Sequence, residues 1–283
     1  MTHPPLAVGL IGYPVEHSLS PAFQQAAFDA LGIPARYELW PTPPESLDER
    51  FRVLRAPGVL GANVTVPHKR AAFARVDQVA GRARRAGAVN TVVNRGGTLY
   101  GDNTDVPGFL APLRERGAPL ADLAVVVLGA GGAARGILVA LGEAGCRQVT
   151  VANRTAERAH ELAAEFGVVA APLDQRLALH LARADLLVNA TSVGWDGASL
   201  PLDAALLDAL PATAIVYDLT YHDTPLLQAA RRRGLETIDG LGMLVHQGAE
   251  SFRLWTGQEP PLEVMWQAAL AARAPGGQAT HRS

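Results

Sequence analysis

Short, largely apolar runs recur along the chain and are separated by stretches of mixed polarity. They cover residues 6–12, 61–66, 124–128, 185–189 and 214–219. Apolar runs of this length without strict alternation are typical of parallel strands that are buried on both faces. Stretches with helical spacing lie between the runs. This alternation of strands and helices predicts an α/β protein.

Turn and capping signals divide the rest of the chain. Further strands are expected at residues 36–40, 148–152 and 236–239. Helices are expected at residues 21–31, 45–54, 70–79, 106–116, 240–255 and 262–272, with another that ends near residue 144. Asn94-Arg95-Gly96-Gly97 lies between two strand-like segments and predicts a β-hairpin. Thr224 precedes Pro225, a pair that is typical of a helix start.

The bulk properties exclude several classes of protein. A chain of 283 residues with net charge −2 is long enough for two domains and has no basic stripe for nucleic acid. Residues 1–5 carry no basic segment and the next apolar run is short, so we expect neither a signal peptide nor a membrane span. The single cysteine, Cys146, cannot form an internal disulfide, which favours the cytoplasm. We expect no metal site.

Lys69 stands out because it is the single lysine, and the other 24 of the 25 Lys and Arg residues are arginines. An ammonium group can give up its proton, whereas a guanidinium cannot. Lys69 ends the sequence Asn63-Val64-Thr65-Val66-Pro67-His68-Lys69. Asn63 and Thr65 are expected on one face of a strand that Pro67 ends, which leaves Lys69 just past the strand end. Open α/β sheets place their chemistry there, so the position favours a chemical role over a stray lysine.

Ser18 and Ser20 lie between the first strand and the first helix. Ser20-Pro21 predicts an N-cap followed by proline at the first helical position. Hydroxyl groups beside the free N–H groups of a helix start form a carboxylate site. Capping by Ser20 is compatible with that site.

The strand at residues 124–128 runs directly into Gly129-Ala130-Gly131-Gly132-Ala133-Ala134. Gly129, Gly131 and Ala134 fit G-x-G-x-x-A within a strand–turn–helix–strand unit, which predicts dinucleotide binding. The second strand of that unit ends in Asn153-Arg154-Thr155, with no acidic residue to bind a ribose 2′-hydroxyl. Arginine accommodates a 2′-phosphate, so the pattern predicts NADP and not NAD. Arg158 lies four residues after Arg154 and can share this role or be a solvated charge, and Thr155 can cap the helix between them.

The ordered set of motifs resembles the shikimate dehydrogenase family, and the resemblance covers residues 9–257. The motifs are Ser18-Leu19-Ser20-Pro21, Asn63-Val64-Thr65-Val66-Pro67-His68-Lys69, Gly87-Ala88-Val89-Asn90-Thr91, Asn103-Thr104-Asp105, Gly129-Ala130-Gly131-Gly132-Ala133, Asn153-Arg154-Thr155, Asn189-Ala190-Thr191-Ser192 and Met243-Leu244-Val245-His246-Gln247-Gly248-Ala249. The resemblance implies NADP-dependent, reversible reduction of 3-dehydroshikimate to shikimate in aromatic amino-acid biosynthesis. A quinate or aminoshikimate dehydrogenase, or a regulatory homologue that binds NADP without turnover, stays open as an alternative.

The resemblance also implies residue roles. Lys69 and Asp105 form the catalytic pair, although Asp105 could instead cap the following helix. The implied substrate residues are Ser18, Ser20, Thr65, Asn90, Tyr221 and Gln247. The implied NADP residues are Gly129, Ala130, Gly131, Gly132, Ala133, Asn153, Arg154, Thr155, Arg158, Thr191, Leu219 and Gly240. The turn after Tyr221 is two residues shorter than the family pattern.

We therefore expect an N-terminal mixed-sheet α/β substrate domain and a Rossmann-type NADP-binding domain with a cleft between them. Residues 1–105 form the first domain, residues 106–240 form the second, and the helices of residues 241–283 pack back on the first. The expected ligands are small molecules, and the sequence leaves open whether the chain forms a homodimer.

Overall fold

The computed structural model describes residues 5–274. Residues 1–4, most of the N-terminal segment considered above, and residues 275–283 lie outside the described residues. The chain forms two compact units. Unit 1 consists of Met1–Gly108 and Leu244–Ser283, and unit 2 consists of Phe109–Met243. Each division lies three residues after the expected one, at 108 against 105 and at 243 against 240.

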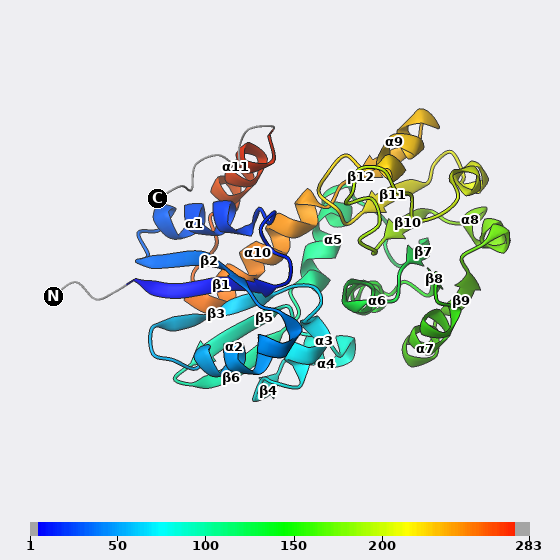
Figure 1. The fold of residues 1–283 in the computed structure, drawn as a ribbon. Coiled ribbons are helices and arrows are strands. Elements are labelled where there is room, and N and C mark those ends of the chain that lie inside the picture. Colours follow the sequence, from blue (N-terminus) through cyan, green and yellow to red (C-terminus); the bar gives the residue numbers. More distant parts are fainter. Residues whose placement is uncertain (1–4, 275–283) are drawn as a thin grey trace. The chain divides into compact units, whose positions relative to one another are not determined.

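Unit 1 is built on a six-stranded mixed sheet (Figure 1). Its strands, in spatial order, are β2 (Ala35–Pro41), β1 (Leu6–Gly12), β3 (Val59–Val64), β5 (Thr91–Arg95), β6 (Thr98–Asp102) and β4 (Gln78–Val79). The strand β1 pairs in parallel with β2 and β3, whereas β5 runs antiparallel to β3 and to β6. The antiparallel β5–β6 pair confirms the predicted hairpin.

Helices from both ends of the chain cover this sheet. They are α1 (Ser20–Ala30), α2 (Leu47–Val53) after the 3-10 turn Pro44–Ser46, α3 (Lys69–Phe73), α4 (Gly81–Ala86) and α11 (Leu262–Arg273). Two more, α5 (Asp105–Glu115) and α10 (Leu241–Thr256), contain the points where the chain passes between the units. The last helix, α11 (red), packs against α1 (blue), as expected (Figure 1).

The helix predicted at residues 70–79 is wrong over its second half. The helix α3 ends at Phe73, and Gln78–Val79 forms β4, which pairs in parallel with β6. The backbone N–H of Asp77 already donates to the Leu99 carbonyl at 2.9 Å. This pairing with a strand about twenty residues further on outweighs local helix preference. The helix α4, which follows, was not predicted.

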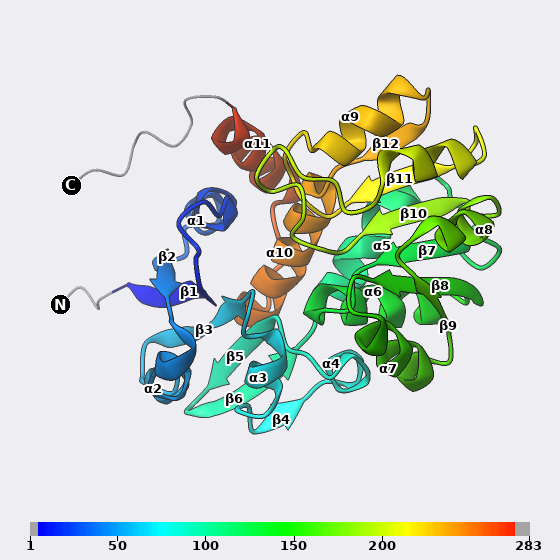
Figure 2. The same cartoon turned by 45° about the vertical axis from the view of Figure 1, so that its right-hand side comes forward.

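Unit 2 is a doubly wound α/β domain with six parallel strands. In spatial order they are β12 (Glu236–Ile238), β11 (Ile215–Asp218), β10 (Leu186–Asn189), β7 (Ala124–Leu128), β8 (Gln148–Asn153) and β9 (Val169–Pro172), and Figure 2 shows most of them in this sequence from yellow to green. The first strand of the unit, β7, is central, as in dinucleotide-binding folds. The predicted Rossmann-type domain is confirmed.

Helices connect these strands. They are α6 (Gly132–Glu143), α7 (Ala156–Phe166), α8 (Ala178–Leu181) and α9 (Pro225–Arg232), with 3-10 turns at Gln175–Leu177 and Ala204–Ala209. The Thr224 hydroxyl accepts the Leu227 N–H at 3.3 Å, so the predicted cap of α9 is confirmed. Within residues 5–274 no helix is long and apolar enough to cross a membrane. The same residues hold no group of three or more His, Cys, Asp or Glu side chains that could bind a metal ion.

Candidate active site

Lys69 and Asp105, 36 residues apart in sequence, meet in unit 1. The Lys69 Nζ lies 2.6 Å from Asp105 Oδ2, and the side chains are 15% and 5% exposed. Lys69 begins α3 and Asp105 begins α5. The Asp105 carboxylate accepts hydrogen bonds from Lys69 and Asn90, so its role is not limited to capping α5. A lysine beside a shielded carboxylate can hold and transfer a proton.

The turn before Lys69 is tied down by backbone hydrogen bonds. The Thr65 N–H donates to Ile11 at 2.8 Å, and the His68 N–H donates to the Thr65 carbonyl at 2.9 Å. This second bond bends the chain at once, so β3 ends at Val64, two residues before the predicted end. The expectation that Thr65 lies on the strand beside Asn63 was therefore wrong. A Cβ at Gly12 would lie 2.4 Å from the Thr65 methyl group, so glycine lets the turn approach β1.

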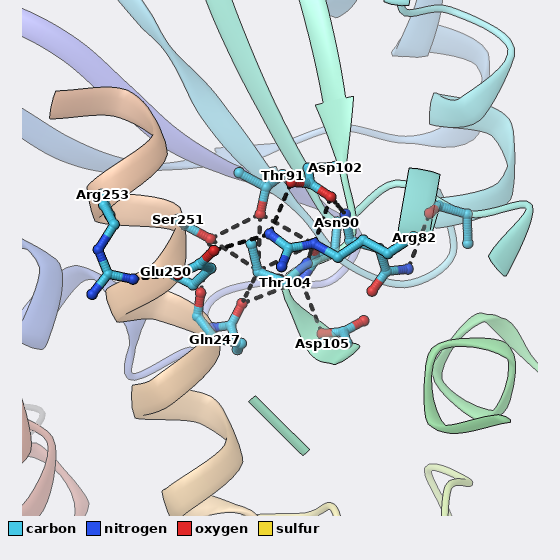
Figure 3. A network of polar contacts seen from close by, with 12 residues as sticks. Arg82, Asn90, Thr91, Asp102, Thr104, Asp105, Gln247, Glu250, Ser251 and Arg253 are labelled. Carbon is cyan, nitrogen blue, oxygen red and sulfur yellow. Dashed lines mark hydrogen bonds and ion pairs between the residues drawn. The ribbon is translucent and has the colours of Figure 1, made fainter. Parts of the chain in front are cut away.

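Asn90 joins the carboxylate to α10. Its Nδ2 lies 2.9 Å from Asp105 Oδ1, 2.9 Å from Thr104 Oγ1 and 3.3 Å from Gln247 Oε1 (Figure 3). Its Oδ1 accepts the backbone N–H of Thr104 at 2.7 Å. Three sequence-predicted residues, Asn90, Asp105 and Gln247, are thus brought together from separate segments of unit 1. The Gln247 amide also donates to the Leu244 carbonyl at 2.9 Å.

Ser18 and Ser20 lie at the start of α1, but the predicted cap is wrong. Ser20 is already the first helical residue, and Leu19 occupies the N-cap position without a side-chain bond. A side chain in the first turn cannot fold back as an N-cap does. Instead the Ser18 hydroxyl accepts the Ser20 N–H at 3.2 Å. Both serines therefore stay beside the helix start, where a carboxylate is favoured.

A buried polar network extends behind Asn90 (Figure 3). Its core is three mutually bonded hydroxyl groups, those of Thr91, Thr104 and Ser251, at separations of 2.8 to 3.1 Å. We call these three groups the hydroxyl triad. Sequence reasoning gave none of them a role in the site, although Thr91 and Thr104 lie in two of the family-like motifs. For Ser251 the available signal was its four-residue spacing from Gln247, which places both on one face of a helix.

A separate ion cluster lies at the edge of this network. Arg82 of α4 binds Asp102 of β6 through two bonds of 2.7 and 2.8 Å and reaches Glu250 of α10 at 3.1 Å. Arg253 also binds Glu250, at 2.5 Å. In Figure 3 these side chains flank the hydroxyl triad. The two-bond fork ties α4 to β6, and the further bond from Arg82 to Glu250 links α10 to both.

The glycine turn of unit 2 has the form that a dinucleotide needs. Gly129 has φ of +111°, and a Cβ there would lie 3.0 Å from the Thr191 methyl group and 3.1 Å from the Ala190 carbonyl. Gly131 is exposed, and a Cβ there would meet no atom within 4 Å. The start of α6 is therefore open to a ligand at its N–H groups, which favour phosphate. Ala130, Gly132 and Ala133 share this turn.

The end of β8 presents two arginines. Asn153 Nδ2 donates to the Thr155 carbonyl at 2.9 Å and fixes the turn. Thr155 is the N-cap residue of α7, but its side chain makes no capping bond, so the predicted hydroxyl cap is wrong. Arg154 and Arg158 are exposed, and within residues 5–274 neither side chain forms a hydrogen bond or ion pair. Both guanidinium groups are available to a phosphate.

A buried carboxylate, Asp218, organises the neighbouring strand ends. It accepts bonds from Asn189 Nδ2 at 3.1 Å, Thr220 N–H at 3.0 Å and Thr224 Oγ1 at 2.8 Å. Burial raises the pKa of Asp218, and these bonds only partly offset that effect. The Asn189 Oδ1 in turn accepts both the N–H and the hydroxyl of Thr191. The position of Thr191 thus depends on Asp218.

The remaining predicted residues also lie in unit 2. A Cβ at Gly240 would lie 2.0 Å from the Leu219 carbonyl, so these two residues touch and glycine is required. Tyr221 packs edge-on against Trp195, with ring centroids 5.1 Å apart, and against His222 at 5.0 Å. All predicted cofactor residues and Tyr221 belong to unit 2. The other substrate residues and the Lys69–Asp105 pair belong to unit 1.

Comparisons with known proteins bear on the family of the chain. Three family models match: the shikimate dehydrogenase substrate binding domain at residues 10–92, shikimate / quinate 5-dehydrogenase at 113–194, and the shikimate 5'-dehydrogenase C-terminal domain at 240–270. Shikimate dehydrogenase (NADP(+)) from Symbiobacterium thermophilum is 48% identical over 94% of both chains, and one from Thermus thermophilus is 47% identical over 94% of this chain and 98% of its own.

A solved structure extends the likeness to the fold. The crystal structure of a shikimate 5-dehydrogenase from Thermus thermophilus, in complex with NADP(H) and shikimate, is 46% identical. It superposes with a TM-score of 0.86 over 94% of this chain and 99% of that one. The two-unit α/β architecture and the sequence relatives lead to one conclusion. The chain belongs to the shikimate dehydrogenase family.

Proposed function

We propose that this chain catalyses the NADP-dependent, reversible reduction of 3-dehydroshikimate to shikimate, a step of aromatic amino-acid biosynthesis. The observation that carries the proposal is the 2.6 Å contact of the single lysine with Asp105 at the edge of the mixed sheet. The family and the names of the relatives support the same reaction. Unit 1 holds the substrate and unit 2 holds NADP.

The chain's own residues supply proton transfer. Bound NADPH provides a hydride, and reduction of a ketone leaves an alkoxide that needs a proton. Lys69 donates its Nζ proton to that oxygen and recovers a proton from solvent. Asp105 fixes the direction of the ammonium group through its 2.6 Å bond. In shikimate oxidation, Lys69 takes the hydroxyl proton instead.

Other residues of unit 1 orient the substrate. The Ser18 and Ser20 hydroxyls, beside the start of α1, bind the carboxylate of the ring. Thr65, Asn90 and Gln247 bind ring hydroxyls or the carboxylate. The Gln247 Oε1 has contacts of only 3.3 and 3.4 Å to donors within unit 1, so it retains the capacity to accept a shorter bond from a ligand. Tyr221, on unit 2, is the remaining member of the proposed set.

Unit 2 fits the cofactor. Gly129, Ala130, Gly131, Gly132 and Ala133 leave the pyrophosphate open access to the start of α6. Arg154 and Arg158 bind the 2′-phosphate with guanidinium groups that bond no other described residue. Asn153 and Thr155 shape that turn. Thr191, Leu219 and Gly240 lie at the ends of neighbouring strands and flank the nicotinamide side.

A cytoplasmic location and a homodimer stay predictions. The single cysteine, Cys146, is buried and donates to the Leu123 carbonyl at 3.1 Å, as a reduced thiol does. Size-exclusion chromatography with light scattering measures the oligomeric state directly.

The test is initial-rate oxidation of shikimate and of quinate, each with NADP and with NAD. We expect the highest kcat/KM for shikimate with NADP. Equal efficiency on quinate would overturn the assignment of substrate. Tight binding of shikimate and NADP without turnover would identify a regulatory homologue and overturn the enzyme assignment.

A further inference from the structure

The hydroxyl triad lies directly behind Asn90, and no role in the reaction has so far been assigned to it. Its members come from three separate segments: Thr91 begins β5, Thr104 precedes α5, and Ser251 lies on α10. All three residues are fully buried. Three hydroxyl groups at one buried point are costly to desolvate unless each is bonded. Their bonds lead to the Asn90 amide, and through it to Asp105.

The orientation of the Asn90 amide is fixed by the backbone. Its oxygen accepts the Thr104 N–H at 2.7 Å, and a backbone N–H can only donate. The amide nitrogen must therefore point to the other side, toward Asp105 Oδ1. An Asn90 flip would place a donor against a donor.

The Asn90 nitrogen has two hydrogens but three acceptors within reach. Thr104 Oγ1 and Asp105 Oδ1 both lie at 2.9 Å, whereas Gln247 Oε1 lies at 3.3 Å. The two short bonds take both hydrogens. The Thr104 hydroxyl thus accepts one Asn90 hydrogen that Gln247 could otherwise accept. The second Asn90 hydrogen is bonded to the Asp105 carboxylate.

The far side of the triad is anchored in the core. The Tyr37 hydroxyl donates to Asn63 Oδ1 at 2.8 Å, which directs the Asn63 nitrogen to Ser251 Oγ at 2.9 Å. Burial raises the pKa of Tyr37, so its hydroxyl stays a donor. Ser251 passes its own hydrogen to the Gln247 carbonyl at 2.9 Å, so its oxygen can only accept. Asn63 and one of the two threonine hydroxyls, Thr91 or Thr104, fill its two lone pairs.

We propose that the hydroxyl triad is a positioning device for the Lys69–Asp105 pair. It holds Asn90 so that Asp105 Oδ1 is occupied and Oδ2 faces Lys69, and it keeps Gln247 Oε1 available to a ligand. Thr104 and Ser251 are its principal members. The role in catalysis rests on the proposed function, whereas the effect on Lys69 does not.

The first test exchanges the hydroxyl and the methyl group of Thr104 separately. Thr104→Val removes the hydroxyl and keeps the shape, and Thr104→Ser keeps the hydroxyl and removes the methyl group. Because a small misplacement of catalytic groups costs up to about 10²-fold, we expect Thr104→Val to lower kcat by about 10-fold or more. We expect Thr104→Ser to stay within about 3-fold of the wild type, and KM for NADP to be unchanged in both.

A readout independent of turnover uses the single lysine. Protein labelled with [15N]lysine gives one side-chain signal, that of Lys69. We expect Thr104→Val to shift the Lys69 15Nζ resonance and Thr104→Ser to preserve it. If the wild type does not oxidise shikimate, the proposed function fails, but this measurement still decides the positioning role.

Ser251 has a matched control on the same helix. Ser251 donates to the carbonyl four residues before it, and Thr256 does the same to Phe252 at 2.8 Å, outside the network. We expect Ser251→Ala to lower kcat and shift the Lys69 signal, and Thr256→Val to do neither. Thermal melting identifies any variant that fails to fold. If Thr104→Val does not fold, the comparison of Ser251→Ala with Thr256→Val still tests the positioning role.

Unchanged kcat and Lys69 signal in folded Thr104→Val or Ser251→Ala would overturn the proposal. Equal loss in Thr104→Val and Thr104→Ser would do so too, because packing would then be the cause.

Discussion

Asp105 in unit 1 and Asp218 in unit 2 are both buried aspartates next to sheet edges, and they differ in what faces them. Asp105 faces a lysine at 2.6 Å and one amide. Asp218 is fully buried and is bonded by an amide, a backbone N–H and a hydroxyl, all neutral. Burial raises the pKa of Asp218 because no cation offsets the loss of water.

The difference distinguishes the proposed catalytic aspartate, Asp105, from a structural one, Asp218. A carboxylate that faces a partly exposed lysine can take part in proton transfer, since the lysine side chain reaches the surface. A carboxylate enclosed by neutral donors can only hold those donors in place. Burial alone therefore does not identify a catalytic aspartate, and the neighbouring charge does.

The largest effect is expected from removing the cation beside Asp105. We expect Lys69→Ala to lower kcat by about 10²- to 10⁴-fold, the usual range for a general acid–base group, with KM for shikimate little changed. Lys69→Arg keeps the charge but cannot release a proton, so it should be almost as slow. Steady-state kinetics measure both. Arg70→Ala, at the next position of α3, is the matched control, and a normal kcat in Lys69→Ala would remove the lysine from the mechanism.

A smaller effect is expected at Arg154, a cation that pairs with no carboxylate among the described residues. Arg154→Gln removes an exposed guanidinium, and a charged hydrogen bond contributes about 1.5–3 kcal/mol. We therefore expect KM for NADP to rise by about 10-fold or more while KM for NAD stays the same. The control is Arg147→Gln, an exposed arginine before the opposite end of β8. An equal rise for both cofactors would contradict a role in binding the 2′-phosphate.

The smallest effect concerns how the contribution of Asp218 to the free energy of unfolding changes with pH. Its folded pKa is raised above 3.8, so the folded state holds a proton that the unfolded state has lost, and this stabilisation disappears as pH rises through the folded pKa. The free energy of unfolding of the wild type minus that of Asp218→Asn should therefore fall as pH rises above 3.8. Urea denaturation across pH measures it.

Asp174 provides a control of opposite sign. Hydrogen bonding to Arg176 lowers the pKa of this exposed carboxyl, so its contribution is present above pH 3.8 and is lost on acidification through the folded pKa. The free energy of unfolding of the wild type minus that of Asp174→Asn should therefore rise with pH or stay flat. A rise of equal size for Asp218→Asn would show that Asp218 is ionised in the fold.

The central strands of the dinucleotide unit could be predicted from the sequence almost to the residue, whereas its edge strand β9 and helix α8 were not predicted. The strand β7 was expected at 124–128 and lies at Ala124–Leu128, and β8 was expected one residue shorter than it is. Buried apolar runs and a glycine turn are local signals, and here they agree with the tertiary fold. Arg154 at the tip of β8 is likewise exposed as expected.

The polar core of unit 1 could not be predicted in the same way. Ser251 binds Asn63 across 188 positions and Thr91 across 160. Nothing near Ser251 in the sequence indicates such partners. The strand β4 was missed for the same reason, because it exists only through its pairing with β6. Single residues with distinctive chemistry, such as Lys69, were identified, as was Asn90, whereas the hydroxyl triad behind Asn90 was not.

The division of unit 1 into two chain segments has a consequence for biosynthesis. A ribosome makes all of unit 2 before it makes Leu244 and the residues that follow. Asn63, Thr91 and Asn90 are therefore complete long before Gln247 and Ser251 emerge to bond them. Domains fold as units during synthesis, so a nascent chain can fold its dinucleotide unit first. The arrangement around Lys69 is then completed by nearly the last helix to be translated, and a chain truncated before α10 lacks it.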